Sequence, residues 1–568
     1  MAETPAKKGG AVKSESKHQI IIALDFGTTF SGMAYALSNP DKKSEVVPIL
    51  DWPGLEGHRQ PKVPTLISYD SNDPSKFKWG GQLDWRSNSI HGPQPACLPT
   101  RDIKAELKML PKDPVDVAAD FIGAIYKHGL DKIKSALVGD YFHSCQKQFV
   151  LSVPAVWSDK AKDRTLRAAE KAGIHPVTLI KEPEAAALYT LHEHEQALKV
   201  GDAFLVCDAG GGTIDLITYE VAKILPVLQL AEVVPGSGGM AGSLGLNKRF
   251  AEAVKNLVGE EQWISLKKSL GWSKAMNEFD KVIKLAFRGG AEETFFVSFP
   301  QVKLEDNPDK NIFNNCWMMT GEDMQGIFDP LITDVLQLVH QQAKSALLKR
   351  QGRAPKGIFL VGGFGSSQYL KKRLEKVVPG VQVIQPDDAW AAIVKGAVLS
   401  QIPTQATVTS TKAVRHYGIR ATCPFDATTD QGRPTYFDSF YGTQRVRDYR
   451  WYIHIGDDLQ RDNPIKLPFY RQVDIKNHTA EDFKFNTQLR SSDKIPAPTY
   501  PDEVKKNCTL TSDMSGIDKS RFKIETGKDG KNYYRVYYDL VMWTTAANLK
   551  FSLEFEGEEM GSVVVSYE

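Results

Sequence analysis

The sequence lacks the features that mark zinc-binding, secreted and membrane-spanning chains. Its six cysteines include no C-x-x-C or C-x-x-x-C pair, which argues against a cysteine-based zinc site, and six thiols in 568 residues are too few for a disulfide framework. The start of the chain has no apolar core of a secretory signal. No apolar run approaches the ~20 residues that a transmembrane helix needs. We therefore expect a cytoplasmic or nuclear protein with reduced thiols and no membrane partner.

An excess of charge of one sign is also missing. Lys and Arg number 71 against 69 Asp and Glu, which gives a formal net charge of +2. This balance excludes a bulk polycation or an acidic tail, and on this ground we expect no nucleic-acid partner. The 44 glycines and 31 prolines are ordinary for this length, so a collagen-like or wholly disordered chain is excluded.

One local pattern occurs twice. Near the start of the chain an apolar run leads into Asp25, a glycine turn with two threonines, and a second apolar run. The same order recurs at Asp208, where three glycines and a threonine separate the two runs. Each copy predicts a strand, a tight turn and a strand, and the repeat predicts a duplicated domain of roughly 180 residues.

The chain changes character after about residue 402. Before it, β-type runs alternate with helical patterns, which predicts an α/β fold. After a stretch rich in Thr and Ser, strict alternation of apolar and polar residues predicts half-buried antiparallel strands, with no long helical segment behind them. The predicted units are a disordered tail at 1–18, a two-lobed domain at 19–402 (lobe I about 19–200, lobe II about 201–402), a linker at 403–413 and an all-β, sandwich-like domain at 414–568.

The two glycine turns are candidate phosphate loops. Glycines let backbone N–H groups approach a polyphosphate, threonine hydroxyls add donors, and a carboxylate at a strand end can hold Mg²⁺ through water. A glycine hairpin without any ligand explains the turn at Asp25 alone equally well. The three successive glycines after Asp208 are costly in chain entropy unless the backbone there must come close to something. Neither is a Walker loop or a dinucleotide-binding fingerprint. The residues of the two loops are Gly27, Thr28 and Thr29, and Gly210, Gly211, Gly212 and Thr213.

Three further features fit the same kind of site. Gly362 and Gly363 stand between a strand and a helix, where they serve either close packing or nucleotide contact at a helix N-terminus. A glycine-rich stretch ends at Gly239. Pro183 suits the first position of a helix and biases Glu182 out of it, so Glu182 is expected to project at a strand end.

In this order, the elements resemble the actin-like ATPase domain of the 70-kDa heat-shock (DnaK-type) chaperones, whose fold has two ribonuclease-H-like lobes. The matching strings are IALDFGTT (22–29), SVPA (152–155), EPEAAA (182–187), CDAGGGTID (207–215), VGG (361–363) and PDDA (386–389). They span about residues 20–400. The β-rich end without a helical lid resembles a degenerate peptide-binding domain, as in the divergent branch typified by heat shock 70 kDa protein 12 and its fungal relatives.

The resemblance implies a role for each matching position. Asp25 and Asp208 would hold hydrated Mg²⁺, Glu182 would order the attacking water, and Thr213 would line the γ-phosphate. The two loops would hold the phosphates of ATP or ADP. Ribose and adenine contacts would fall to Gly239, Glu278, Lys281, Gly362 and Gly363. A lysine beside the γ-phosphate would be Lys108 or Lys104, either of which is equally well a surface lysine.

The resemblance implies an ATP-binding, Mg²⁺-dependent ATPase, chaperone-like, whose nucleotide state controls a β-rich domain that binds an unfolded peptide or protein client. A co-chaperone is the other partner that it implies. Two alternatives stay open. One is a nucleotide-sensing scaffold with little hydrolysis, because the family's adenine-stacking arginine is replaced by residues 364–366. The other is a small-molecule kinase, since sugar kinases also carry Asp-x-Gly-Thr-Thr.

Overall fold

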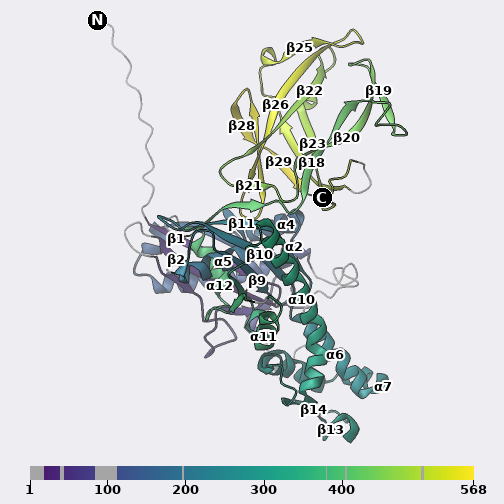
Figure 1. Cartoon of the computed structure of the whole chain (residues 1–568). Helices are drawn as coiled ribbons and strands as arrows, with labels where there is room; N and C mark the ends of the chain where they lie inside the picture. The colour runs from purple at the N-terminus through teal and green to yellow at the C-terminus, as the bar shows by residue number, and fades with distance from the viewer. Residues whose placement is uncertain are drawn as a thin grey trace.

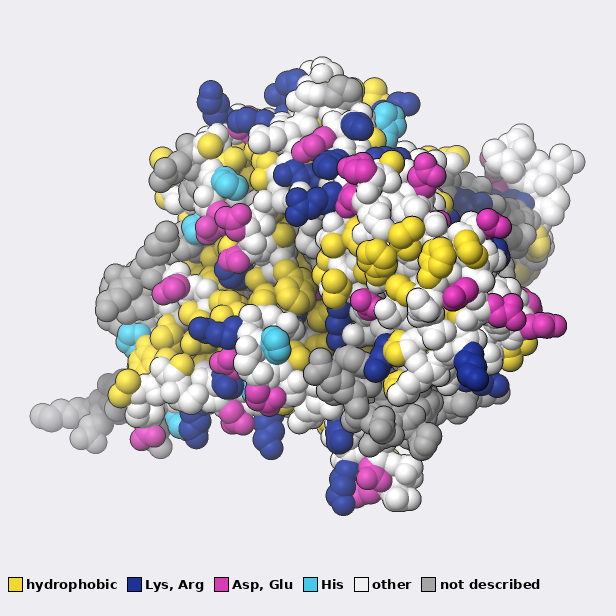
Figure 2. Space-filling model, turned by 90° about the horizontal axis from the view of Figure 1, so that it is seen from below, with side chains coloured by type: hydrophobic (Ala, Val, Ile, Leu, Met, Phe, Trp, Pro, Cys, Tyr) yellow, Lys and Arg dark blue, Asp and Glu magenta, His cyan; other side chains and the backbone are white. Residues whose placement is uncertain are grey.

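The computed structural model describes residues 18–38, 44–83, 112–194, 197–378, 380–402, 406–499 and 504–567. Residues 1–17 of the predicted tail, and both candidate lysines Lys104 and Lys108, lie outside these ranges. Figure 1 shows a β-rich C-terminal part resting on an α/β part, from which α6, α7, β13 and β14 extend away on the opposite side. On the face seen in Figure 2, basic and acidic side chains are interspersed.

Lobe I is built on a six-stranded sheet of order β3-β2-β1-β7-β8, with β4 on β2. Alternate residues of β1 face two cores: Ile20, Ile22 and Leu24 pack with α2 and α4, whereas Ile21 and Ala23 pack with α5 and α12. The strands are β1 (Gln19–Phe26), β2 (Phe30–Ser38), β3 (Val46–Pro48), β4 (Lys62–Pro64), β7 (Gln146–Val153) and β8 (Val177–Lys181). The helices are α2 (Pro114–Ala136), α4 (Asp159–Lys171), α5 (Glu182–Glu193) and α12 (Ala392–Leu399), and the smaller elements are β5 (Ile67–Tyr69), β6 (Phe77–Trp79), η1 (Gly80–Gln82) and α3 (Tyr141–Ser144).

Lobe II repeats this plan in a seven-stranded sheet of order β16-β15-β9-β10-β11-β17-β21. As β1 pairs antiparallel with β2 and parallel with β7, so β9 pairs antiparallel with β10 and parallel with β15. Helices α5 and α12 share a core with strands of both sheets, so they lie between the lobes. The strands are β9 (Ala203–Ala209), β10 (Ile214–Lys223), β11 (Gln229–Gly239), β15 (Gly357–Val361), β16 (Gln382–Ile384), β17 (Thr407–Lys412) and β21 (Asp458–Gln460).

The helices of lobe II cover the other face of its sheet and continue into a small outlying sheet, β12-β14-β13. Among the described residues no helix is long and apolar enough to cross a membrane. The elements are α6 (Leu244–Val258), α7 (Glu260–Leu266), α8 (Leu270–Glu278), η3 (Phe279–Ile283), α9 (Lys284–Ala286), β12 (Thr294–Ser298), η4 (Pro308–Lys310), β13 (Ile312–Phe313), β14 (Cys316–Thr320), α10 (Gly321–Lys349), η5 (Phe364–Ser366) and α11 (Gln368–Glu375).

The stretch predicted as a linker is built into the sheet of lobe II. Its residues Thr407–Lys412 form β17, which pairs parallel with β11 and antiparallel with β21. Val408 and Ser410 of this strand are buried. Since β21 comes from the part predicted as the β-rich domain, the two parts of the chain share backbone hydrogen bonds.

The C-terminal part is a sandwich of two antiparallel sheets around one core, as the alternating pattern predicts. One sheet has the order β19-β20-β18-β23-β24-β29, and the other has the order β22-β26-β27-β28 with β25 on β26. The only helical elements described after α12 are the short turns η6 (Ala480–Phe483) and η8 (Lys519–Arg521). The strands are β18 (His416–Pro424), β19 (Thr435–Asp438), β20 (Thr443–Ile453), β22 (Ile465–Asp474), β23 (Lys484–Ser492), β24 (Lys505–Asp513), β25 (Lys523–Thr526), β26 (Asn532–Thr544), β27 (Leu549–Phe555), β28 (Glu558–Ser562) and β29 (Val564–Tyr567).

Candidate functional site

The two glycine turns face each other across the gap between the lobes. A Cβ added to Gly211 would lie 2.2 Å from Oγ1 of Thr29, and one added to Gly212 would lie 3.0 Å from Oγ1 of Thr28. Side chains other than hydrogen at these positions would push the turns apart. The glycines therefore allow the β1–β2 turn and the β9–β10 turn to approach at van der Waals distance, which places the backbone N–H groups of both turns at one point between the lobes.

The turn of lobe II is fixed from behind by the start of α6. The backbone N–H groups of Gly242, Ser243 and Leu244 donate to the carbonyls of the three glycines of the turn, at 2.9–3.2 Å. The stretch that ends at Gly239 leads directly into this support, and Gly239 itself pairs with Ile214 at the start of β10. The carbonyl groups of the turn are thus occupied on the α6 side.

The glycine pair after β15 reaches the same place. Strand β15 lies beside β9, with Val361 in register with Asp208. Gly362 has φ +86°, and a Cβ there would lie 2.4 Å from Oδ1 of Asp208. The left-handed backbone and the close approach both require glycine. Gly362 therefore lies against the carboxylate of Asp208, which precedes the β9–β10 turn, and Gly363 follows Gly362 in the chain.

Four buried carboxylates gather at these strand ends. Asp25 and Asp208 are each the last residue but one of their strands, β1 and β9. Asp215 is the second residue of β10, and Glu182 is the first residue of α5. Glu182 was expected just outside the helix, and the helix begins one residue earlier than Pro183 suggests. Asp25 Oδ1 accepts a hydrogen bond from Ser152 Oγ at 2.6 Å. Asp215 Oδ1 accepts one from the backbone N–H of Val156 in lobe I.

Sequence reasoning missed the cation of this cluster, Lys62. Its Nζ lies 2.6 Å from Oδ2 of Asp25, and its side chain is only 6% exposed. Strand β4 places it there by pairing Lys62 with Gly32 of β2. The segment around Lys62 has no periodicity that would assign it to a strand, and no sequence spacing links it to Asp25. Only the pairing of β4 with β2 reveals the contact.

The four acids of the cluster outnumber its buried lysines, which are Lys62 and also Lys162, whose charge attracts Asp215. Burial, reinforced by Asp215, raises the pKa of Asp208 to about 8. Burial and the neighbouring carboxylates raise the pKa of Glu182 well above its usual value. Burial would lower the pKa of the Lys62 ammonium, but the attraction of Asp25, with Asp208 and Glu182 behind it, raises it. Added positive charge would therefore stabilise the ionised acids.

The residues suit a divalent cation held jointly with a phosphate group. Oδ1 of Asp208 and Oδ2 of Asp215 are buried and have no hydrogen-bond partner among the described residues. Buried carboxylate oxygens in this state need a cation or a donor. No three acidic, His or Cys side chains of the described part form a closed metal site. A cation here would complete its coordination with water and phosphate oxygens, as Mg²⁺ commonly does.

Two predicted residues are not brought into the cluster by any described contact. Glu278 ends α8, and Lys281 lies in the following π-helical turn, η3. This turn is held to α6 by Asp280, whose Oδ1 accepts from Asn247 at 2.8 Å and pairs with Lys284. Glu278 and Lys281 therefore stay predictions, as does the role of Lys108.

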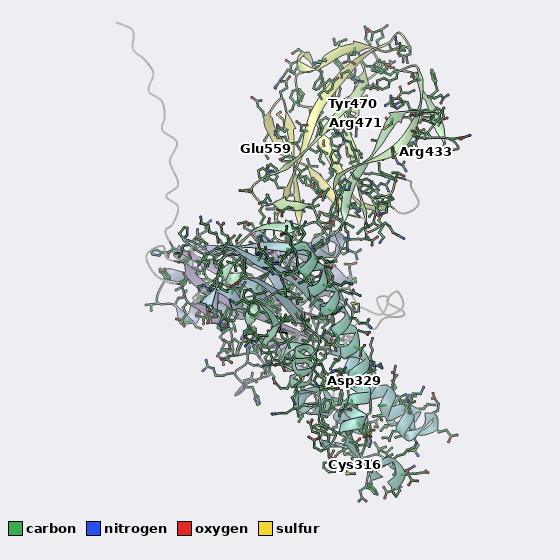
Figure 3. All side chains as sticks on the ribbon, viewed as in Figure 1. Cys316, Asp329, Arg433, Tyr470, Arg471 and Glu559 are labelled. Atoms are coloured by element: carbon green, nitrogen blue, oxygen red, sulfur yellow. The ribbon has the colours of Figure 1, made fainter. Side chains whose placement is uncertain are left out.

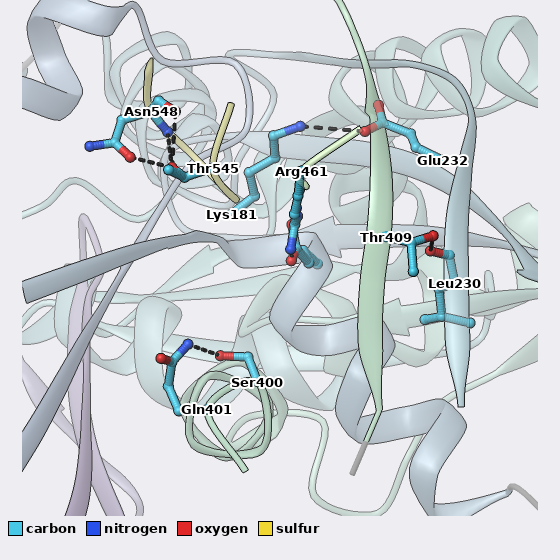
Figure 4. Close-up of polar contacts among 10 residues, drawn as sticks. Lys181, Leu230, Glu232, Ser400, Gln401, Thr409, Arg461, Thr545 and Asn548 are labelled. Atoms are coloured by element: carbon cyan, nitrogen blue, oxygen red, sulfur yellow. Dashed lines mark hydrogen bonds and ion pairs between the residues drawn. The ribbon is translucent and has the colours of Figure 1, made fainter. Parts of the chain in front are cut away.

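The β-rich domain contacts the same region through charged groups. Arg461, just after β21, donates to both carboxylate oxygens of Glu184, at 2.7 and 2.8 Å, two residues beyond Glu182. Lys181, one residue before Glu182, pairs with Glu232 of β11 at 3.4 Å (Figure 4). At a second contact, Asp159 of α4 accepts from Tyr417 and Asn507 of the β-rich domain, at 2.9 and 2.8 Å. The first turn of α5 thus lies between the carboxylate cluster and the β-rich domain.

Comparison with known proteins agrees with this architecture. Residues 123–408 match the family model described as Hsp70 protein. Mouse heat shock 70 kDa protein 12A is 24% identical over 491 residues, which cover 68% of this chain and 70% of the relative. Human heat shock 70 kDa protein 12B is 23% identical, with 68% and 69% covered, and the chaperone protein HscA homolog of Vibrio parahaemolyticus is 24% identical, with 61% and 52% covered. The two lobes form the actin-like ATPase fold of that family, and the chain is a divergent member of the Hsp70 family.

Proposed function

We propose that this protein binds ATP, hydrolyses it with Mg²⁺, and uses its nucleotide state to control the β-rich domain as a chaperone-like client-binding unit. The observation that carries the proposal is the convergence of two glycine loops, buried carboxylates and Lys62 at one point between the lobes. Membership of a family of ATPases supports the same activity.

Phosphoryl transfer to water requires positioned phosphates, a metal ion and an oriented water molecule. The backbone N–H groups of the two turns would bind the phosphates, and Asp25 and Asp208 would hold the hydrated Mg²⁺. Bound Mg²⁺ neutralises phosphate charge. Lys62 supplies a fixed positive charge beside Asp25, and Glu182 would hold the attacking water by a hydrogen bond. Thr213 borders the second turn, where its hydroxyl adds a donor.

The contact between Arg461 and Glu184 supports control of the β-rich domain. A change in the position of α5 at Glu182 acts on Glu184 within the same helical turn, and Glu184 is bonded to Arg461. The proposed partners are an unfolded peptide or protein client and a co-chaperone. The proposed site of action is the cytoplasm or nucleus, because the five described cysteines are free thiols.

The test is single-turnover hydrolysis of bound ATP with Mg²⁺ by the full chain and by Asp208→Asn. We expect hydrolysis in the wild type and a loss of at least about 100-fold in the variant, because bound Mg²⁺ would lose one of the two carboxylates proposed to hold it. Asp334→Asn, at an exposed position of α10, is the matched control and should hydrolyse normally. Equal turnover in Asp208→Asn would show the assignment of the metal to be wrong.

A second candidate, a nucleotide-sensing scaffold, is favoured by one observation. The ammonium group of Lys62 is held by Asp25 at 2.6 Å, and a lysine that stays in this ion pair is not free to stabilise the γ-phosphate during hydrolysis. Tight binding of ATP without turnover in either protein would support this function over hydrolysis.

A further inference from the structure

The six-stranded sheet of the β-rich domain has a basic and aromatic outer face. Arg447, Tyr449 and Trp451 occupy alternate positions of β20, and Arg420 and Arg490 lie on β18 and β23. Their neighbours Ile419 and Leu489 are buried in the core, so these side chains point the opposite way. We call the five residues Arg420, Arg447, Tyr449, Trp451 and Arg490 the basic face. Figure 3 shows Arg433 near β19 and β20 of this sheet and Tyr470 on the other sheet.

Strand register brings the five side chains together. Arg420 pairs with Tyr449, and Gly418 pairs with Trp451 on one side and Arg490 on the other. From the spacing of strands and of residues within them, the five side chains occupy a patch of roughly 10 by 13 Å. The three arginines thus lie on a diagonal across β20, β18 and β23. Tyr449 lies level with Arg420, and Trp451 lies level with Arg490.

The rings are held in place on the sheet. A Cβ on Gly418 would lie 2.7 Å from Cε3 of Trp451, so the indole covers this glycine. The indole Nε1 donates to the carbonyl of Pro498 at 2.9 Å. The centroids of Tyr449 and Trp451 lie 5.7 Å apart at a tilt of 31°. Both rings remain partly exposed, which leaves them pre-oriented for stacking with a planar group.

The positive charge of this face is not balanced by acidic side chains of the described ranges. No described carboxylate lies within 4.0 Å of a guanidinium nitrogen of Arg420, Arg447 or Arg490, and the first two side chains are exposed. The carboxylates of Asp430 and Asp448 pair instead with Arg433, at 2.6 and 3.7 Å. The site therefore attracts an anion.

We propose that the basic face binds single-stranded nucleic acid. The arginines would contact successive phosphates, and Tyr449 and Trp451 would stack on bases, which is how exposed sheets and aromatic platforms bind single strands. A polyanion without bases would leave the rings unused. The overall charge balance predicted no such partner, because a sum over the chain hides cations that are gathered on one face. The site is separate from the proposed ATP site.

The first test is fluorescence anisotropy of a labelled 20-nucleotide oligothymidylate with the full chain, at several salt concentrations. We expect binding that weakens with salt. Arg420→Ala with Arg447→Ala should weaken it at least about 10-fold and reduce the slope of log K against log salt by about 1.4, from ~0.7 per phosphate contact. Lys523→Ala with Lys550→Ala, exposed lysines of the other sheet, removes equal charge and should change neither value. No binding at low salt, or equal loss in both double variants, overturns the proposal.

The second test separates stacking from charge. Tyr449→Ala should weaken binding about 10-fold, whereas Tyr449→Phe, which keeps the ring, should bind as the wild type does. Heparin, which has charge but no bases, should bind the two variants equally. If Tyr449→Ala binds the oligonucleotide normally, the face takes polyanions in general and the proposal is wrong. Nucleotide affinity at the separate ATP site, measured on every variant, checks that the chain is folded.

Discussion

The ion pair between Arg461 and Glu184 predicts a large and specific loss of stability in Arg461→Met. Glu184 is 1% exposed, and its two oxygens bind one guanidinium nitrogen at 2.7 and 2.8 Å. Removing one partner of a buried pair costs about 3–5 kcal/mol, because the other charge stays buried. Since the Arg461 side chain is 23% exposed and water can enter when it is shortened, we expect about 3 kcal/mol.

The assay is urea unfolding followed by tryptophan fluorescence, read at the first transition of the full chain. Glu184→Gln in the Arg461→Met background removes the unpaired charge and should recover at least about 2 kcal/mol. The control is Arg521→Met, which breaks an exposed ion pair with Glu556 inside the β-rich domain and should cost less than about 1 kcal/mol. A loss below about 1 kcal/mol in Arg461→Met, or additive losses in the double variant, would refute the reasoning.

Three further predictions concern the cluster between the lobes. Lys62→Met should slow single-turnover ATP hydrolysis about 100-fold and change the affinity for ADP far less, since a fixed charge acts mainly on the transition state. An unchanged rate would mean that another cation stabilises the phosphates. Gly211→Ala should weaken ATP binding at least about 10-fold in calorimetry, because its Cβ would stand 2.2 Å from Oγ1 of Thr29, whereas Gly326→Ala, with open space around its Cβ, should bind normally. The nucleotide-free protein should lose stability as the pH rises from about 4 to about 8, because folded Asp208 keeps its proton up to a pKa of about 8 while the unfolded chain releases it near 3.8. In thermal melts at several pH values, the stability of Asp208→Asn should depend less on pH than that of the wild type. If both proteins lose stability equally as the pH rises, Asp208 is not the cause of the pH dependence.

Much of the fold could be predicted because its signals are local. The apolar runs around Asp25 and Asp208 are long, and the glycines between the runs mark sharp turns. These signals predict two strand-turn-strand units, and the structure has them as β1–β2 and β9–β10. The alternation in β26 predicted a half-buried strand. The stretch 403–413 was predicted as a linker because Thr and Ser dominate it, yet Thr407–Lys412 forms β17, since a polar strand is stable when both of its edges find partners.

The site was predictable only where one segment carries the pattern. The glycines and aspartates of the two turns stand in recognisable strings, and the structure brings them to one point. Lys62 could not be found in this way, because a single lysine after a proline in a segment without periodicity has no distinguishing context. Its role depends on the pairing of β4 with β2 and on the absence of other cations near Asp25 among the described residues.

Strand β21 makes the C-terminal sandwich part of the ATPase sheet. Its three residues cover the outer edge of β17, which in turn covers β11. A fragment cut at residue 402 would lose both strands and leave β11 with a row of unpaired N–H and C=O groups next to buried apolar residues. Such an edge is a template for pairing with other chains. The lobes alone should therefore be more prone to self-association than the whole protein, because β21 covers the edge of β17 in the whole chain.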